Sequence, residues 1–148
     1  MTTKILFLHG FFASGSCAPA QALKRAFEGK AEVLTPDLPL HPCEALTFIT
    51  SLCEREHPSA LVGNSNGSFL AQIVASRLKM PALLGNPHFE MTRFLSEHIG
   101  AHEYKSPRVD GRQHFVIDQP LIDEFADIQA HQWDDCRPEI TDRIWGLF

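Results

Sequence analysis

Residues 61–75 read LVGNSNGSFLAQIVA, and this stretch decides the fold. An apolar run ends at Gly63, Ser65 follows between two asparagines, and Gly67 comes just before a run of apolar residues at helical spacing. The pattern is G-x-S-x-G between a buried strand and a helix, a context in which a serine sits on a very tight strand-to-helix turn. Glycines at both flanks avoid Cβ clashes where the neighbouring chains approach closely.

Such a turn gives Ser65 a chemical role. Its hydroxyl would stand at the carboxyl edge of the sheet, where the first amides of the next helix favour developing negative charge. The pattern therefore predicts Ser65 as the nucleophile of a hydrolase. The alternative interpretation is a serine that only caps the helix between two convenient glycines.

A second feature follows the apolar run at residues 4–8. His9 and Gly10 form a turn there, and in α/β-hydrolases such a turn supplies one backbone N–H of the oxyanion hole, while the residue after the nucleophile supplies the other. The predicted donors are the amides of Phe11 and Asn66. The His9 side chain is expected to brace the loop.

The remainder of the first half alternates between strand and helix patterns. Short apolar runs bounded by turn residues predict strands, and apolar residues at helical spacing predict the helices between them. This alternation predicts an α/β fold with a mostly parallel sheet of about five strands in the order 2-1-3-4-5, and helices on both faces. The predicted strands are 4–10, 31–36, 59–65 and 81–87, and the helices are 18–29, 42–57 and 66–78.

The second half is less regular. A short helix is predicted over 90–100, followed by a polar, turn-rich run and then by a short extended piece at 114–118. A further helix is predicted over 119–129 and a fifth strand over 142–148. No linker divides the chain, so residues 1–148 are expected to form a single domain.

The composition of the chain argues against several classes of function. The net charge is −5 and the pI is about 5.9, so we expect no nucleic-acid partner. No apolar run reaches the ~18 residues of a membrane span, and the first ten residues do not resemble a secretory leader, so a cytoplasmic protein is expected. The four cysteines lack zinc-site spacing, so no metal is expected.

Taken together, the motifs resemble the small bacterial α/β-hydrolase esterases of the YqiA-like group. The resemblance rests on five stretches: LFLHGF at 6–11, PDLP at 36–39, VGNSNGS at 62–68, MPALLGNP at 80–87 and DRIWGLF at 142–148. It implies a three-layer α/β-hydrolase fold and hydrolysis of small-molecule esters without a cofactor. Gly10, Phe12 and Asn64 flank the predicted catalytic groups and are expected to contact the substrate.

One part of the group's pattern has no counterpart here. In that group an acidic residue follows the fifth strand and a histidine comes later, whereas this chain ends at Phe148. We therefore expect a shortened fold and little activity, since only Ser65 and the oxyanion positions carry over. His88 could act as a substitute base, oriented by Glu90 or Asp118, or it could be a solvent-facing loop histidine. A non-catalytic binding protein that uses the Ser65 crevice is the alternative function.

The last predicted strand carries a further expectation. As the edge of the sheet it would leave backbone groups unpaired and expose apolar side chains, which invites pairing with another chain. We expect a homodimer or higher assembly through this edge. The side chains concerned are Ile144, Trp145, Leu147 and Phe148.

Overall fold

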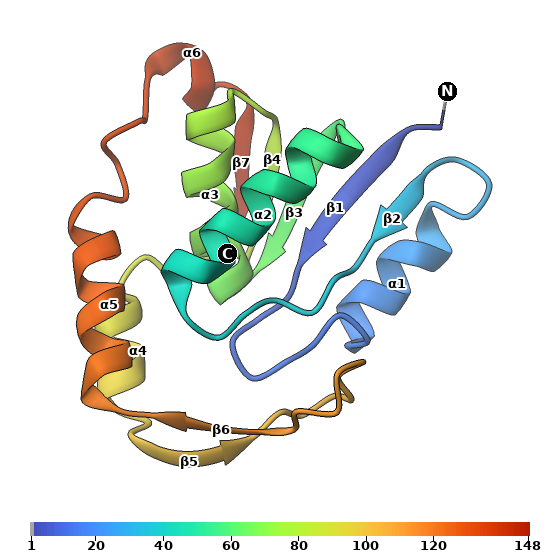
Figure 1. The fold of residues 1–148 in the computed structure, drawn as a ribbon. Coiled ribbons are helices and arrows are strands. Elements are labelled where there is room, and N and C mark those ends of the chain that lie inside the picture. The colour runs from blue at the N-terminus through green and yellow to red at the C-terminus, as the bar shows by residue number, and fades with distance from the viewer. Residues whose placement is uncertain (1) are drawn as a thin grey trace.

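The computed structural model describes residues 2–148, and its centre is a parallel five-stranded sheet (Figure 1). The strand order is β2-β1-β3-β4-β7, and every neighbouring pair is parallel. The predicted α/β class and strand order are confirmed. The strands are β1 (Lys4–Leu8), β2 (Glu32–Leu34), β3 (Ala60–Asn64), β4 (Ala82–Gly85) and β7 (Ile144–Leu147).

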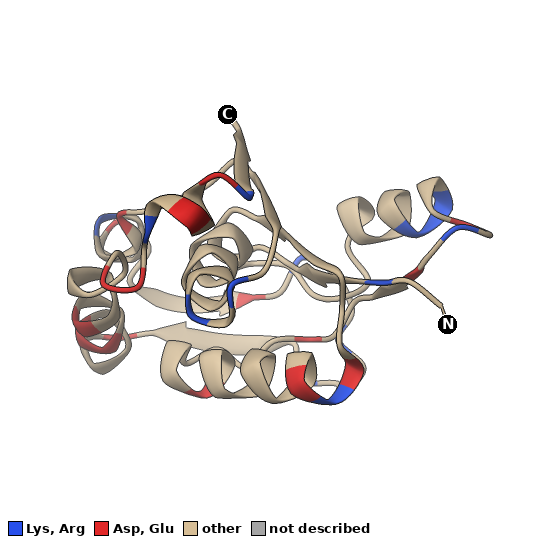
Figure 2. Ribbon diagram, turned by 90° about the horizontal axis from the view of Figure 1, so that it is seen from above, with Lys and Arg blue, Asp and Glu red and all other residues tan. Residues whose placement is uncertain are grey.

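Helices cover both faces of this sheet, as Figure 2 shows from above. Alternate side chains of β1 point to opposite faces. Ile5 and Phe7 pack with α1 (Ala18–Ala26), while Leu6 and Leu8 belong to the larger core formed with α2 (Pro42–Glu56) and α3 (Asn66–Leu78). Burial on both faces explains why this strand reads as a continuous apolar run.

Helix α3 is the central helix of the larger core. Residues 66–76 of this helix are all buried. It begins directly after Ser65 and ends at Leu78; the next residue, Lys79, adopts a left-handed conformation (φ 57°) two residues before Pro81. Because packing fixes the whole helix, its amino end is held firmly at the carboxyl edge of the sheet.

The segment between β4 and β7 is here called the cap segment (residues 86–143). Most of it lies at this edge, and its last residues return to the opposite end of the sheet, where β7 begins (Figure 1). Its two strands form a separate antiparallel sheet. Phe115 and Phe125 of the cap segment are buried in the larger core, so the cap is packed firmly against the sheet domain. The elements are α4 (Met91–Ser96), β5 (Gly100–Glu103), β6 (His114–Ile117), α5 (Gln119–Ala130) and α6 (Pro138–Thr141).

The cap segment differs from the sequence prediction in three elements. The helix predicted over 90–100 ends at Ser96, where the Ser96 hydroxyl and the His98 ring bond back to the carbonyls of Thr92 and Phe94. Strand β5 and helix α6 were not predicted. Gly100 opens β5 with φ 131°, an angle that side chains rarely adopt, and the strand exists through its pairing with β6.

No helix among residues 2–148 combines the length and the apolarity needed to cross a membrane. In the same part of the chain, no three His, Cys, Asp or Glu side chains are grouped in a way that could hold a metal ion. All four cysteines carry free thiols.

Strand β7 forms one edge of the sheet, as predicted for the fifth strand. Trp145 is 60% exposed, Leu147 61% and Phe148 97%. The expected apolar edge is therefore present, and more than half of the surface of each of these residues is exposed.

Candidate active site

Ser65 is the single residue between β3 and α3. Its backbone angles are φ 56° and ψ −116°, a combination that a residue with a Cβ rarely adopts. Its N–H donates to the Gly85 carbonyl of β4 (3.0 Å), and its own carbonyl accepts from the Ser68 and Phe69 amides. Strain of this kind costs of order 1–3 kcal/mol and persists only where surrounding structure enforces it. The predicted strained turn is confirmed.

The two flanking glycines leave no room for a side chain. A Cβ on Gly63 would lie 2.5 Å from the Gly67 carbonyl oxygen, and a Cβ on Gly67 would lie 1.9 Å from the Leu8 carbonyl oxygen. Both clashes involve backbone atoms, which cannot swing aside as a flexible side chain can. The glycines therefore allow β1, β3 and α3 to approach closely enough to form the turn.

The predicted oxyanion donors start from adjacent strands at the same edge. Leu8 pairs with Gly63 in register, so the turn after β1 meets the turn after β3. A Cβ built on Gly10 would lie 3.6 Å from the Ser65 Cβ. Within residues 2–148 the amides of Phe11 and Asn66 donate no hydrogen bond to the protein. Their convergence on a single point beside the Ser65 hydroxyl stays a prediction.

The His9 side chain braces this region, as expected. The ring is only 4% exposed. The Leu38 N–H donates to Nε2 (2.9 Å), and Nδ1 donates to the Gly10 carbonyl (2.8 Å). Burial lowers the pKa of His9 below its ordinary value, with a smaller contribution from the Arg108 charge. The ring is thus neutral and linked to two loops at once.

Phe12, one of the predicted substrate contacts, joins the turn after β1 to the cap segment. Its ring lies 5.8 Å from Phe94 and 5.2 Å from His102, and its carbonyl accepts from the Lys105 amide (2.8 Å). Phe12 therefore packs under the cap. A third predicted contact besides Phe12 and Gly10, Asn64, is half-buried, with its amide nitrogen 4.0 Å from where a Cβ on Gly10 would lie.

The structure does not connect His88 to Ser65. The His88 ring packs edge-on against Phe94 at 5.4 Å, and neither it nor the Ser65 hydroxyl makes a hydrogen bond within residues 2–148. The two residues expected to orient it are engaged elsewhere: Asp118 caps α5 by accepting the Leu121 N–H, and Glu90 lies 3.9 Å from Arg93. A role for His88 as base stays a prediction.

A small void adjoins the predicted oxyanion donors, and a larger cavity shares part of its lining. A void of about 10 Å³, which is about the size of one water molecule, lies against Gly10, Phe11 and Asn66. Asn66 Oδ1 is buried there without a hydrogen-bond partner in the described chain. A larger cavity of about 700 Å³ lies beyond it. The residues that line both spaces are Pro39, Leu40 and Tyr104.

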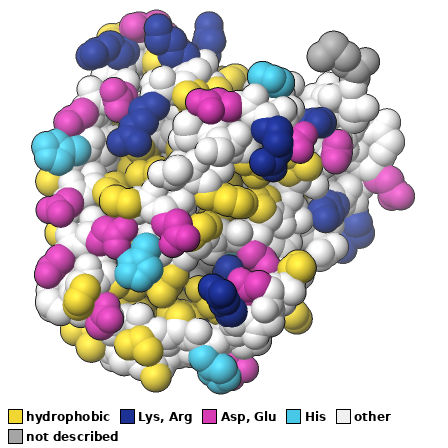
Figure 3. Space-filling view, in the orientation of Figure 1, with side chains coloured by type: hydrophobic (Ala, Val, Ile, Leu, Met, Phe, Trp, Pro, Cys, Tyr) yellow, Lys and Arg dark blue, Asp and Glu magenta, His cyan; other side chains and the backbone are white. Residues whose placement is uncertain are grey.

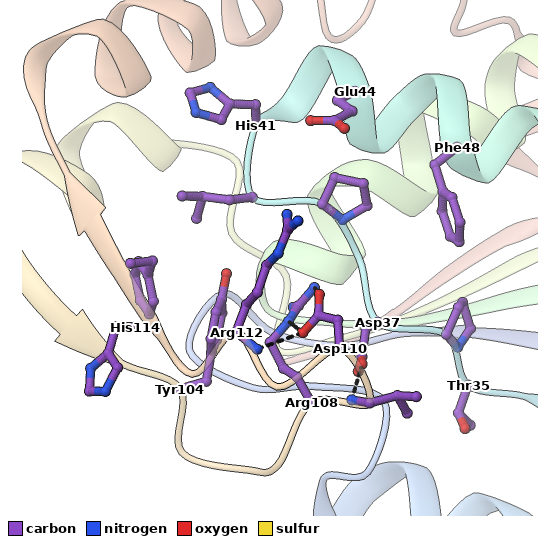
Figure 4. A pocket seen from close by; sticks show the side chains of 15 residues that line it. Thr35, Asp37, His41, Glu44, Phe48, Tyr104, Arg108, Asp110, Arg112 and His114 are labelled. Carbon is purple, nitrogen blue, oxygen red and sulfur yellow. Dashed lines mark hydrogen bonds and ion pairs between the residues drawn. The ribbon is translucent and has the colours of Figure 1, made fainter.

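The larger cavity lies between α2 and the β5–β6 connection (Figure 4). Phe48 reaches it from α2, and Tyr104 and Arg112 reach it from the connection. On the face shown in Figure 3, apolar side chains lie between charged groups and histidines. Such a mixture suits a small molecule with an apolar body and a few polar groups.

Hydrogen bonds fix the cavity wall. Arg108 stacks over the Tyr104 ring at 4.7 Å and pairs with Asp110 at 3.3 Å. The Arg112 amide and then the Arg108 side chain hold the pKa of Asp110 below its ordinary value. Asp37 accepts from the amides of Gly15 and Val109, each at 2.8 Å. The sequence indicated only that this connection is polar and turn-rich, so its role as a cavity wall was missed.

Comparison with known proteins identifies the family of this chain. Residues 4–137 match UPF0227, which is described as an uncharacterised protein family. The chain belongs to this family. The match contains both the turn after β1 and the Ser65 turn, and the predicted membership of a small α/β-hydrolase group is confirmed.

The UPF0227 chain is also similar to solved structures. NosK from Streptomyces actuosus is 20% identical, with a TM-score of 0.55 over 97% of this chain and 62% of NosK. Dienelactone hydrolase from Anabaena variabilis ATCC 29413 is 15% identical, with a TM-score of 0.48 over 99% of this chain and 74% of that enzyme. The chain thus spans about three fifths of the length of NosK. The likeness to NosK supports the fold alone.

Proposed function

We propose that the chain carries the nucleophile and the oxyanion hole of a serine hydrolase that acts on small esters. The observation that carries the proposal is the backbone of Ser65, held at φ 56° and ψ −116° between two glycines that have no room for a Cβ. A residue that only capped the helix would not need this strain, because caps adopt ordinary extended angles. The strain instead serves to present the hydroxyl at the carboxyl edge.

In the proposed reaction, the Ser65 oxygen attacks the ester carbonyl carbon and the carbonyl electron pair moves onto oxygen. The amides of Phe11 and Asn66 donate to that oxyanion. The tetrahedral adduct collapses, the alcohol leaves with a proton, and water hydrolyses the acyl-serine. Each preorganised donor is worth roughly 10²–10³ in rate.

The attack also requires a base, because a serine hydroxyl is a poor nucleophile at neutral pH. No side chain among residues 2–148 bonds to the Ser65 hydroxyl. In serine proteases, loss of a triad member costs roughly 10⁴–10⁶ in rate and leaves about 10³–10⁴ over water. We therefore expect slow turnover from this chain.

The test measures p-nitrophenyl acetate hydrolysis and, by mass spectrometry, the residue acylated or labelled by a fluorophosphonate. We expect slow turnover that Ser65→Ala abolishes, with the adduct on Ser65. Ser51→Ala is the matched control, since Ser51 is an exposed helical serine far along the chain from the turn. Brisk hydrolysis that survives Ser65→Ala, or an adduct elsewhere, would contradict the proposal. Additional loss in His88→Ala would support His88 as the base.

A second candidate function is ligand binding without turnover. The cavity of about 700 Å³, together with a Ser65 hydroxyl that has no bonded base among residues 2–148, favours it. In that case a bound ester would stay intact, and Ser65→Ala would leave its dissociation constant unchanged. Hydrolysis of the bound ester in the wild type but not in Ser65→Ala would exclude this candidate.

A further inference from the structure

The peptide unit between Gly10 and Phe11 is held by two hydrogen bonds. Its carbonyl oxygen accepts from the Ala13 amide at 3.1 Å and from His9 Nδ1 at 2.8 Å. A trans peptide is planar, so its N–H points away from its C=O, and no peptide bond within residues 2–148 is cis. Fixing the oxygen therefore fixes the direction of the Phe11 N–H, which is the proposed oxyanion donor.

The two nitrogens of His9 make different contacts. A carbonyl oxygen can only accept, so Nδ1 carries the proton, and the Leu38 N–H can only donate, so Nε2 is the bare acceptor. This defines one neutral tautomer. Nε2 anchors the ring to the loop after β2, and Nδ1 acts on the peptide that carries the oxyanion donor.

The surroundings of His9 keep the ring in this state. Burial disfavours the charged form, and Arg108 acts in the same direction, whereas Asp37 and the bond to Gly10 oppose it. Tyr104 is the other titratable side chain on the adjoining void, and burial raises its pKa, so it is uncharged at neutral pH. The ring therefore stays a donor at Nδ1 and an acceptor at Nε2 under physiological conditions.

We propose that His9 is a positioning residue of the hydrolase site: its Nδ1–H orients the Gly10–Phe11 peptide so that the Phe11 N–H faces the Ser65 hydroxyl. The inference rests on the proposed function and adds to it the side chain that sets the oxyanion donor. His9 would touch no substrate, because its ring is buried and both nitrogens are engaged. A merely structural histidine would need only the anchoring bond to Leu38.

Two substitutions distinguish the two hydrogen bonds of His9, the anchoring bond to Leu38 and the orienting bond to Gly10. In His9→Asn the amide nitrogen stands near the position of Nδ1, so the bond to Gly10 is kept and the bond to Leu38 is lost. In His9→Gln the amide oxygen can reach the position of Nε2, so the Leu38 bond is kept and the Gly10 bond is lost. The direction of the Phe11 N–H is measured by residual dipolar couplings, with the Leu8 and Ala75 amides as references within the fold.

We expect His9→Asn to keep the Phe11 coupling of the wild type and His9→Gln to change it, while the reference couplings stay the same. An unchanged Phe11 coupling in His9→Gln would overturn the proposal. The wild type provides a measurement that needs no variant: the ring ¹⁵N shifts of His9 must show a proton on Nδ1 and none on Nε2. The opposite tautomer would overturn the proposal even if His9→Gln failed to fold.

Kinetics give the second readout. His9→Gln should lower the rate of Ser65 acylation about 10²-fold, the effect of losing one oxyanion donor, with KM almost unchanged. His9→Asn should stay within about threefold of the wild type, and equal rates in both variants would count against the proposal. If the wild type does not acylate Ser65 at all, the proposed function fails, while the couplings still decide whether His9 orients the Phe11 amide.

Discussion

Replacing Gly67 by alanine perturbs the contact that forms the Ser65 turn. The new Cβ would lie 1.9 Å from the Leu8 oxygen, 2.5 Å from the Leu8 carbonyl carbon and 2.8 Å from the His9 oxygen. Real Cβ atoms essentially never lie within 3.0 Å of such atoms, so β1 and α3 must separate by about 1 Å in a close-packed region. Overpacking costs about 1–3 kcal/mol and occasionally more. Because all three clashing atoms are backbone atoms of Leu8 and His9, which cannot rotate away, we expect a loss of about 3 kcal/mol in the free energy of unfolding.

The assay is urea unfolding followed by far-ultraviolet circular dichroism, analysed with a common m value. A loss of this size should also lower Tm by roughly 10 °C. Gly10→Ala is the control, because its Cβ would meet its nearest atoms at an ordinary 3.6 Å, and we expect it to cost less than about 1 kcal/mol. A cost below about 1 kcal/mol for Gly67→Ala, or an equal cost for both variants, would refute the steric reasoning.

Three further predictions follow from particular residues. Ser65→Gly should raise the free energy of unfolding by about 1 kcal/mol, because glycine relieves the strain at φ 56°; urea curves measure this, and destabilisation would show that no strain is stored there. The fold lowers the pKa of His9, so stability should be complete above about pH 6.5 and fall as the pH drops through the lowered pKa. Urea unfolding at pH 7.5 and 5.5 measures this, and an undiminished pH dependence in His9→Asn would assign it to other groups. The exposed β7 edge should promote self-association, which Trp145→Lys should weaken; light scattering across a dilution series tests this, and a wild-type monomer at every concentration would contradict it.

The sheet could be predicted because its signals are local. Strands such as β1 and β3 are buried and parallel, so they read as short apolar runs that end at glycine or at a turn. The cap segment could not be predicted in the same detail. Strand β5 reads Gly-Ala-His-Glu, without alternation, and exists because β6 lies beside it. Pairing partners of this kind are not encoded in the strand's own residues.

The same division holds at the candidate site. The strained turn at Ser65 was predictable because its signal is local. Gly63 and Gly67 lie within the same five residues and indicate that no side chain fits beside the turn. His9 bonds to Leu38, 29 residues away, and Asp37 bonds to Val109, 72 residues away. No local sequence pattern predicts hydrogen bonds between such distant loops. His88 stays an untested prediction. Its place after β4 made it a candidate base, but its ring packs against Phe94 instead of bonding to Ser65.

The bonds between the loop after β1 and the cap segment have a consequence for the order of folding. The Ser14 amide donates to the Ser106 hydroxyl, 92 residues away, and the Lys105 amide donates to the Phe12 carbonyl. During synthesis, β1 to β4 are made before residues 104–109, and long-range contacts form slowly because closing the intervening loop costs entropy. The first four strands and the Ser65 turn can therefore assemble while residues 11–16 are still free of the cap segment. The loop that follows the proposed Phe11 donor would be among the last parts to reach its final structure, and unfolding of the cap alone would free this loop while the sheet stayed intact.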